Sequence, residues 1–289
     1  MTVGRTASAP TGGSGDGGTA GTGGGERTER GAPGFGAALR SEWAKFLALP
    51  SNRAIIAATV FLTVGITALT GLFGDTGAIA REQADGRYSV IFFGASFGVW
   101  TFSALAANVV AAEYRTGAIA WTLTATPRRA RVLGAKFLVV GAAAPASGLV
   151  IALANFWVTQ TVLARAGEDV LTLAEPGMLR AVLVYIPVGM AVQSLLTAAA
   201  AAVLRSGPAA FVSVLLLGLL PIAVAPVLGG WWGENIPRYM TGAATESLAG
   251  IAVPGTPGFL PTLPAALVVL GWTALFLAVA TAVFERRDA

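Results

Sequence analysis

Residues 209–229 read AAFVSVLLLGLLPIAVAPVLG, an apolar stretch without a single charged residue. An α-helix needs roughly 20 apolar residues to cross the hydrocarbon core of a membrane. Six stretches of comparable character lie along the chain, over 54–73, 90–112, 132–163, 181–204, 209–229 and 263–284. The sequence therefore predicts an all-α, polytopic membrane protein with six transmembrane helices.

The composition agrees and removes several classes of chemistry. Hydrophobic residues make up 55% of the chain and charged residues only 12%, whereas soluble domains average about 25% charged residues. The chain has no Cys and no His, which excludes disulfides, thiolate metal sites, zincin motifs and Ser–His dyads. It also lacks a P-loop, so we expect no nucleotide hydrolysis by that machinery. The basic residues sit at membrane borders and not in one stripe, which argues against a nucleic-acid partner.

The apolar stretches are electrically bare. No charged residue falls well inside any of them, and an ionisable group at mid-membrane usually marks an ion or proton path. Helix breaks are possible at Pro145, Pro187 and Pro221, and secondary transporters often use broken helices, so that class is not excluded. The lack of ionisable groups in the spans nevertheless favours an energy source in another subunit.

The distribution of Lys and Arg predicts the orientation. With the N-terminus inside, 14 of the 19 basic residues and 7 of the 15 acidic ones are cytoplasmic. The two sides then carry +7 and −3, and both termini are cytoplasmic. Arg in place of Lys, together with abundant Ala and Gly, is typical of a high-GC bacterial genome, so we expect a bacterial plasma membrane.

Two segments precede the first span. Residues 1–35 are rich in Gly and Thr, with scattered Ser, Pro and charged residues, and we expect a disordered cytoplasmic tail. In residues 36–50, apolar residues recur at helical spacing around Glu42 and Lys45, which predicts an interfacial helix with Trp43 at headgroup depth. The alternative is a simple extension of the first span. In either case, we expect residues 36–289 to form one membrane domain.

The predicted cytoplasmic segment after the second span, residues 113–131, is unusually rich in apolar and basic residues for a loop. Ile119 and Leu123 lie four apart with Trp121 between them, which predicts a short helix with an apolar docking face. Thr126 and Pro127 are a good start signal for the next helix. A plain positive-inside anchor is the alternative reading. Glu113, beside Arg115, is either half of a gating ion pair or a solvated helix end.

Two sequence motifs of this chain resemble those of a known protein family. Ser41-Glu42-Trp43-Ala44-Lys45, and Glu113-Tyr114-Arg115-Thr116-Gly117 running into 123–129 with Lys136 closing the segment, resemble type-2 ABC exporter permeases. The resemblance implies pairing with a second permease copy or a related chain, and two cytoplasmic ABC ATPase subunits that dock on the loop after the second helix. ATP and Mg would belong to those subunits, and this chain would bind no cofactor and carry no catalytic residue.

The resemblance also assigns regions. Residues 115–126 would form the coupling helix, 36–50 the amphipathic connecting helix, and 230–262 an extracellular, partly re-entrant segment. The expected ATPase-coupling residues are Glu113, Arg115, Gly117, Ile119, Trp121, Leu123, Pro127 and Arg128.

The predicted function is the permease subunit of an ATP-driven exporter, not itself an enzyme. The alternative is a non-transporting accessory or sensory subunit of the same complex; a lipid-modifying membrane enzyme is disfavoured by the missing His and Cys. A drug, a lipid, a peptide and a polysaccharide all stay open as substrates.

A glycine pattern and several polar residues in the spans each have two possible roles. Gly94 and Gly98 form a G-x-x-x-G pattern, which permits close helix contact or is incidental in so Gly-rich a chain. Polar residues in or near the spans either line a translocation path or, more often, hydrogen-bond a neighbouring helix; they are Asn108, Asn155, Gln160, Tyr185 and Gln193.

Overall fold

The computed structural model describes residues 34–75, 92–115 and 129–286, and every regular element in these ranges is helical. Six of the helices are long and apolar enough to cross a membrane. The prediction of an all-α membrane protein with six spans is therefore confirmed, and the chain is a multi-pass membrane protein. The predicted tail lies almost entirely outside the described residues.

The spans follow the predicted stretches closely. Five are single α-helices: α2 (Pro50–Phe73), α5 (Phe93–Arg115), α7 (Arg129–Ala166), α10 (Gly207–Leu228) and α13 (Thr262–Arg286). The fourth span is composite, with α8 (Pro176–Arg180), a π-helical turn (Ala181–Tyr185) and α9 (Ile186–Leu204). Pro187 follows the π-helical turn and has no backbone N–H to donate to the helix. A π-helical turn is one local adjustment to such a missing hydrogen bond.

Helix α1 (Phe35–Ala48) is separate from the first span. Leu49 between α1 and α2 is extended, with φ −73° and ψ 115°, and Pro50 opens α2. The side chain of Asn52 donates from Nδ2 to the carbonyl oxygen of Phe46 at 3.0 Å and holds the bend. The alternative of a simple extension of the first span is wrong; the interfacial position of α1 stays a prediction.

Helix α9 is the most buried of the spans and packs against α5, α7, α10 and α13. Residues 198–202 are five consecutive buried alanines. Small side chains let helix backbones approach each other closely in a membrane protein, which explains how one helix contacts so many neighbours.

The G-x-x-x-G pattern of α5 is a true helix contact. A Cβ on Gly94 would lie 2.4 Å from the backbone oxygen of Thr63 in α2, and one on Gly98 would lie 2.8 Å from the Thr63 methyl group. Thr59, Thr63 and Thr67 form the buried ridge of α2 that meets these glycines. The pattern is therefore not incidental.

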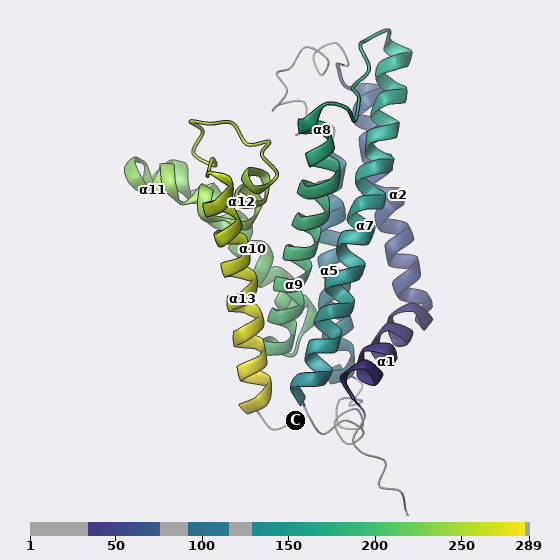
Figure 1. Cartoon of the computed structure of the whole chain (residues 1–289), viewed down its shortest axis with the longest axis vertical. Coiled ribbons are helices and arrows are strands. Elements are labelled where there is room, and N and C mark those ends of the chain that lie inside the picture. The colour runs from purple at the N-terminus through teal and green to yellow at the C-terminus, as the bar shows by residue number, and fades with distance from the viewer. Residues whose placement is uncertain (1–33, 76–91, 116–128, 287–289) are drawn as a thin grey trace, which may run out of the picture. The chain divides into compact units, whose positions relative to one another are not determined.

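Between the last two spans the chain forms α11 (Gly230–Asn235), a 3-10 turn (Pro237–Tyr239) and α12 (Thr241–Leu248). Trp272 of α13 donates from Nε1 to the carbonyl oxygen of Tyr239 at 2.9 Å, and Ser247 accepts from the backbone of Leu260 at 3.1 Å. These bonds fold the segment back onto α13. Figure 1 shows α11 and α12 toward the end of the bundle away from α1.

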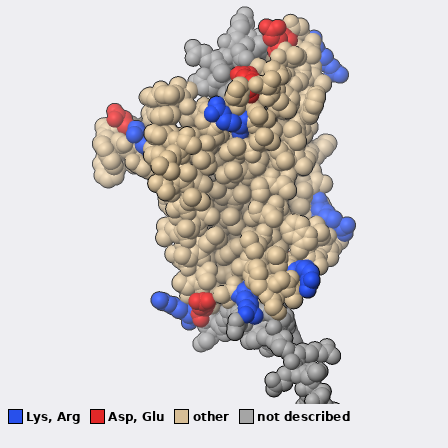
Figure 2. Space-filling model, in the orientation of Figure 1, with Lys and Arg blue, Asp and Glu red and all other residues tan. Residues whose placement is uncertain are grey.

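Charged side chains lie mainly toward the ends of the helices. On the face drawn in Figure 2, Lys, Arg, Asp and Glu gather toward the two ends of the helices and leave a broad band without charge between them. A band of that kind fits a hydrocarbon environment, because an exposed charge there is costly.

Candidate functional site: a buried charge cluster at the ends of α5 and α7

Four charged side chains from three helices meet at one place. Glu42 and Lys45 come from α1, Glu113 from the last turn of α5, and Lys136 from the early part of α7. Lys136 Nζ lies 2.7 Å from Glu42 Oε2 and 3.0 Å from Glu113 Oε1. Lys45 Nζ lies 2.6 Å from Glu42 Oε1 and 3.1 Å from Glu113 Oε1. Each carboxylate thus contacts both ammonium groups, and we call these four residues the charge cluster.

The charge cluster is mostly withdrawn from solvent. The side chains of Lys136, Glu42 and Glu113 are 4%, 6% and 12% exposed, and only that of Lys45 is accessible, at 45%. A buried charge is tolerated only when it is paired and hydrogen-bonded. Two lysines and two glutamates balance each other here, which is the condition for burying all of them together.

The electrostatics of Lys45 show which effect wins. Burial acts to lower the pKa of Lys45, but hydrogen bonds and Coulombic attraction to Glu42 and Glu113 outweigh it, so the pKa lies above its ordinary value of 10.5. The ammonium form is therefore favoured at every physiological pH. One oxygen of Glu113, Oε2, is buried and has no hydrogen-bond partner in the described part of the chain.

The position of the charge cluster gives it its interest. Glu113 lies two residues before the end of α5, and Lys136 lies seven residues after the start of α7, about two turns into that helix. Residues 116–128 connect these two helix ends. The charge cluster therefore ties α1 to both helices that flank this loop, and a displacement of either helix end would pull on α1 through charge-assisted hydrogen bonds.

Part of the predicted site is brought together by this arrangement. Glu42, Lys45 and Glu113 meet, although they come from two motifs that lie 68 residues apart. Glu113 is not a solvated helix end, so that alternative is wrong; its observed partners are the two lysines. Trp43 lies outside the charge cluster, is 39% exposed, and packs its ring at 6.2 Å from that of Phe46.

The rest of the predicted coupling site lies beyond the described ranges. This applies to the short helix around Trp121 and the start signal at Thr126, as well as to the side chain of Arg115. The other predicted residues in this group are Gly117, Ile119, Leu123, Pro127 and Arg128.

The contribution of Lys136 to the charge cluster was not predicted. Its sequence signal is clear in hindsight: Lys45 and Lys136 are the only lysines of the chain, against 17 arginines. A lysine seven residues into an apolar helix needs a buried partner, and Glu42 supplies it from 94 positions earlier in the sequence.

The polar residues of the spans divide between the two readings. Gln160 accepts from the backbone of Leu171 at 2.7 Å through Oε1 and therefore supports a local turn. Asn155 is fully buried in α7, and neither atom of its amide has a partner within the described ranges. Tyr185 and Gln193 line a cavity between α5, α9, α10 and α12.

Among the described residues no group of three or more His, Cys, Asp or Glu side chains is placed to hold a metal ion. A search of protein-family models and a search of curated proteins each return no match. The interpretation of the chain therefore rests on its own geometry and on the motif resemblance described above.

Proposed function

We propose that this chain is the membrane-spanning permease subunit of an ATP-driven exporter of the type-2 ABC class. It works in a bacterial plasma membrane with both termini in the cytoplasm, as a dimer with a second copy or a related permease. A cytoplasmic ABC ATPase docks on residues 115–126 and supplies the ATP and Mg. Helix α1 lies in the inner membrane interface.

The charge cluster is the observation that carries the proposal. A subunit driven from outside needs a rigid link between its docking loop and the rest of its helices. Glu113 precedes residues 116–128 in the sequence and Lys136 follows them, and each pairs with α1 at 3.1 Å or less through Lys45 or Glu42. Force on the loop is thereby shared among α1, α5 and α7.

The balance of charge supports an imported energy source. An ion-coupled transporter needs a group that gains and loses a proton or an ion during the cycle. In the charge cluster, each lysine faces two carboxylates, and the pKa of Lys45 lies above its ordinary value. Lys45 therefore keeps its charge at physiological pH, which suits a mechanical link and not a proton relay.

The test is purification of the tagged full chain from its native membrane together with its bound partners, followed by reconstitution into vesicles. We expect an ABC ATPase to co-purify and the complex to hydrolyse ATP. The chain alone should show no ATP hydrolysis. Deletion of residues 115–126 should remove the ATPase while leaving the chain in the membrane.

A variant can separate coupling from folding. Replacing both Glu42 and Lys136 by Met removes one buried pair and keeps Lys45 opposite Glu113, so the charge stays balanced. We expect this double variant to fold and bind the ATPase but to lose ATP-driven transport. Arg53→Met, which removes an exposed charge from α2, serves as the control.

Three results would contradict the proposal. The first is directed transport by the chain alone, and the second is retention of the ATPase after the deletion. The third is an intact complex that hydrolyses ATP but moves none of the candidate cargoes, which favours the accessory or sensory subunit.

A further inference from the structure

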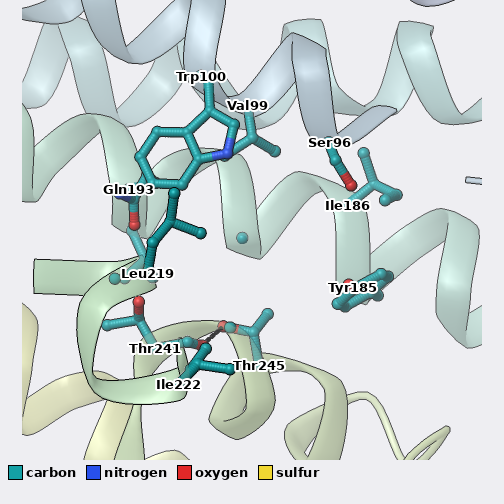
Figure 3. A pocket seen from close by; sticks show the side chains of 14 residues that line it. Ser96, Val99, Trp100, Tyr185, Ile186, Gln193, Leu219, Ile222, Thr241 and Thr245 are labelled. Atoms are coloured by element: carbon teal, nitrogen blue, oxygen red, sulfur yellow. Dashed lines mark hydrogen bonds between the residues drawn. The ribbon is translucent and has the colours of Figure 1, made fainter. Parts of the chain in front are cut away.

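A cavity of about 200 Å³ lies between α5, the π-helical turn, α9, α10 and α12. None of the 14 residues that line it is charged. Figure 3 shows Trp100 and Gln193 toward one side of this space, Tyr185 toward another, and Thr241 and Thr245 from α12 closing it from below. The residues come from four separate segments, so the cavity is a product of the tertiary fold.

Missing side chains create the space. A Cβ on Gly218 of α10 would lie 3.5 Å from the Trp100 ring, and one on Gly189 of α9 would lie 3.7 Å from the Thr245 methyl group. Both distances are ordinary contacts, so alanine would fit at either position and a larger side chain would project into the cavity. The glycines therefore leave a volume that the surrounding helices do not fill.

The wall carries a buried polar atom without a partner among the described residues. The Gln193 side chain is only 7% exposed, and its amide nitrogen Nε2 makes no hydrogen bond with any described residue. Leaving a buried donor unpaired is unfavourable, so the Gln193 amide calls for an acceptor from outside the chain. Thr245 is different, because its hydroxyl donates to the carbonyl oxygen of Thr241 at 2.7 Å.

The remaining features restrict the chemistry of an occupant. The lining offers no charged side chain to pair with an ionic ligand, and an unpaired buried ion is very costly, so the cavity favours an uncharged ligand. An apolar cavity of about 150 Å³ is known to hold benzene, so 200 Å³ accommodates a ring or a short chain with one small polar group. Leu219 and Ile222 of α10 line the cavity and are also 52% and 43% exposed, so the cavity is open on the side of α10.

We propose that this cavity binds the uncharged polar end of an amphiphile that enters from the bilayer. A carbonyl oxygen accepts from Gln193 Nε2, an apolar group packs against Trp100, and the tail extends along α10 into the lipid. The role of this site as the substrate site rests on the proposed exporter function, whereas binding itself does not.

The binding test uses the full chain in phospholipid vesicles without ATP. The probe is an N-decyl benzamide that carries a photoreactive diazirine on its ring. We expect saturable labelling that maps to α5, α9 and α10 around Trp100 and Gly218. An analogue in which a permanent cation replaces the amide should not compete, and decylbenzene, which lacks the carbonyl, should compete weakly.

Two pairs of variants test the assignment. Gln193→Leu keeps the size of the side chain but removes the donor, and we expect binding to weaken about 3- to 10-fold. Asn155→Leu removes a similarly buried and unpartnered amide from outside the cavity and should not change binding. Gly218→Val narrows the cavity beside Trp100 and should weaken saturable labelling strongly, whereas Gly271→Val, with open space around it in α13, should not.

The source of the amphiphile is resolved by the vesicles. Diacylglycerol carries ester carbonyl groups and no charge, and its dialkyl ether analogue lacks those carbonyl groups. Labelling that falls when the ester, but not the ether, is added to the vesicles would identify an uncharged lipid ester as an occupant. Equal labelling with the two additives would exclude that lipid ester as the occupant, and saturable labelling at the cavity supports the site in both cases.

Labelling elsewhere, or labelling that both Gln193→Leu and Gly218→Val leave unchanged, would overturn the proposed site. The latter result would mean that water or a second copy of the chain satisfies Gln193. Site-specific labelling combined with an assembled complex that lacks transport would instead retain the site and overturn the exporter function.

Discussion

The two ends of helix α5 offer opposite environments. Near its C-terminal end, Glu113 belongs to a closed, charge-balanced cluster in which each carboxylate contacts both ammonium groups. Near its N-terminal end, Trp100 faces an uncharged cavity of about 200 Å³ whose wall holds a buried donor, Gln193 Nε2, without a partner among the described residues. The two residues are 13 positions apart, or about 20 Å along the helix. One end is built to hold a fixed arrangement and the other to admit a ligand.

The comparison assigns a task to α5. Among the helices in the described part of the chain, only α5 carries residues of both the charge cluster and the cavity wall. It also packs mainly against α9, which supplies Gln193. A shift of α5 at the loop end would therefore be felt at the cavity, which is the arrangement that the proposed exporter requires.

The largest effect should come from unbalancing the charge cluster. Lys136→Met leaves Glu42 and Glu113 with only Lys45, and we expect a loss of about 3–5 kcal/mol in the free energy of unfolding. Thermal unfolding in detergent measures it. The double variant Glu42→Met with Lys136→Met should recover most of the loss. Equal destabilisation of the single and double variants would contradict the claim that charge balance matters.

A smaller loss in the free energy of unfolding should follow from overpacking the contact between α5 and α2. Gly94→Ala places a methyl group 2.4 Å from the Thr63 carbonyl oxygen, and overpacking of this kind costs about 1–3 kcal/mol. Gly65→Ala in α2, where nothing lies within 4 Å, is the matched control and should stabilise the helix slightly. If both substitutions behave alike in thermal unfolding, the cavity end is looser than the contact distances indicate.

The bend between α1 and α2 should contribute about as much as one buried hydrogen bond. Asn52→Leu removes the donor to Phe46, and we expect a loss of about 1 kcal/mol. Cysteine cross-linking between α1 and α7 in an otherwise Cys-free chain should also become less efficient, because the bend fixes α1 against the charge cluster. Unchanged cross-linking would show that the ion pairs alone hold α1 in place.

The smallest effect should be a dependence on alkaline pH. The pKa of Lys45 is raised above 10.5 in the folded chain, so its stabilisation is fully present below 10.5 and is lost as the pH rises beyond that value. The melting temperature of the wild type should approach that of Lys45→Met above this pH. Parallel curves for the two proteins across the same range would remove Lys45 from the stabilising set.

Much of the fold could be predicted because each span is a local property of the sequence. The stretch 209–229 became α10 at Gly207–Leu228, and the stretch 263–284 became α13 at Thr262–Arg286. Helix ends moved by a few residues, because the boundary of a helix depends on caps and neighbours as well as on hydropathy.

The candidate sites were only partly predictable. Glu42, Lys45 and Glu113 were singled out by motif, and Tyr185 and Gln193 as polar residues in apolar surroundings. Neither Lys136 nor the glycines that open the cavity was given a role. A glycine lacks a side chain for many reasons in a chain with 37 of them, and only its neighbours reveal which one creates space.

The sequence by itself determined that the chain crosses a membrane six times, because twenty apolar residues in a row settle that question without any partner. The tertiary structure alone decided which charges are neutralised and where a donor is left unmatched. Glu42 and Lys136 lie 94 positions apart and meet only when α1 folds against α7. The Coulomb energy of a pair depends on distance in space and on exclusion of water, and neither is written in the order of the residues.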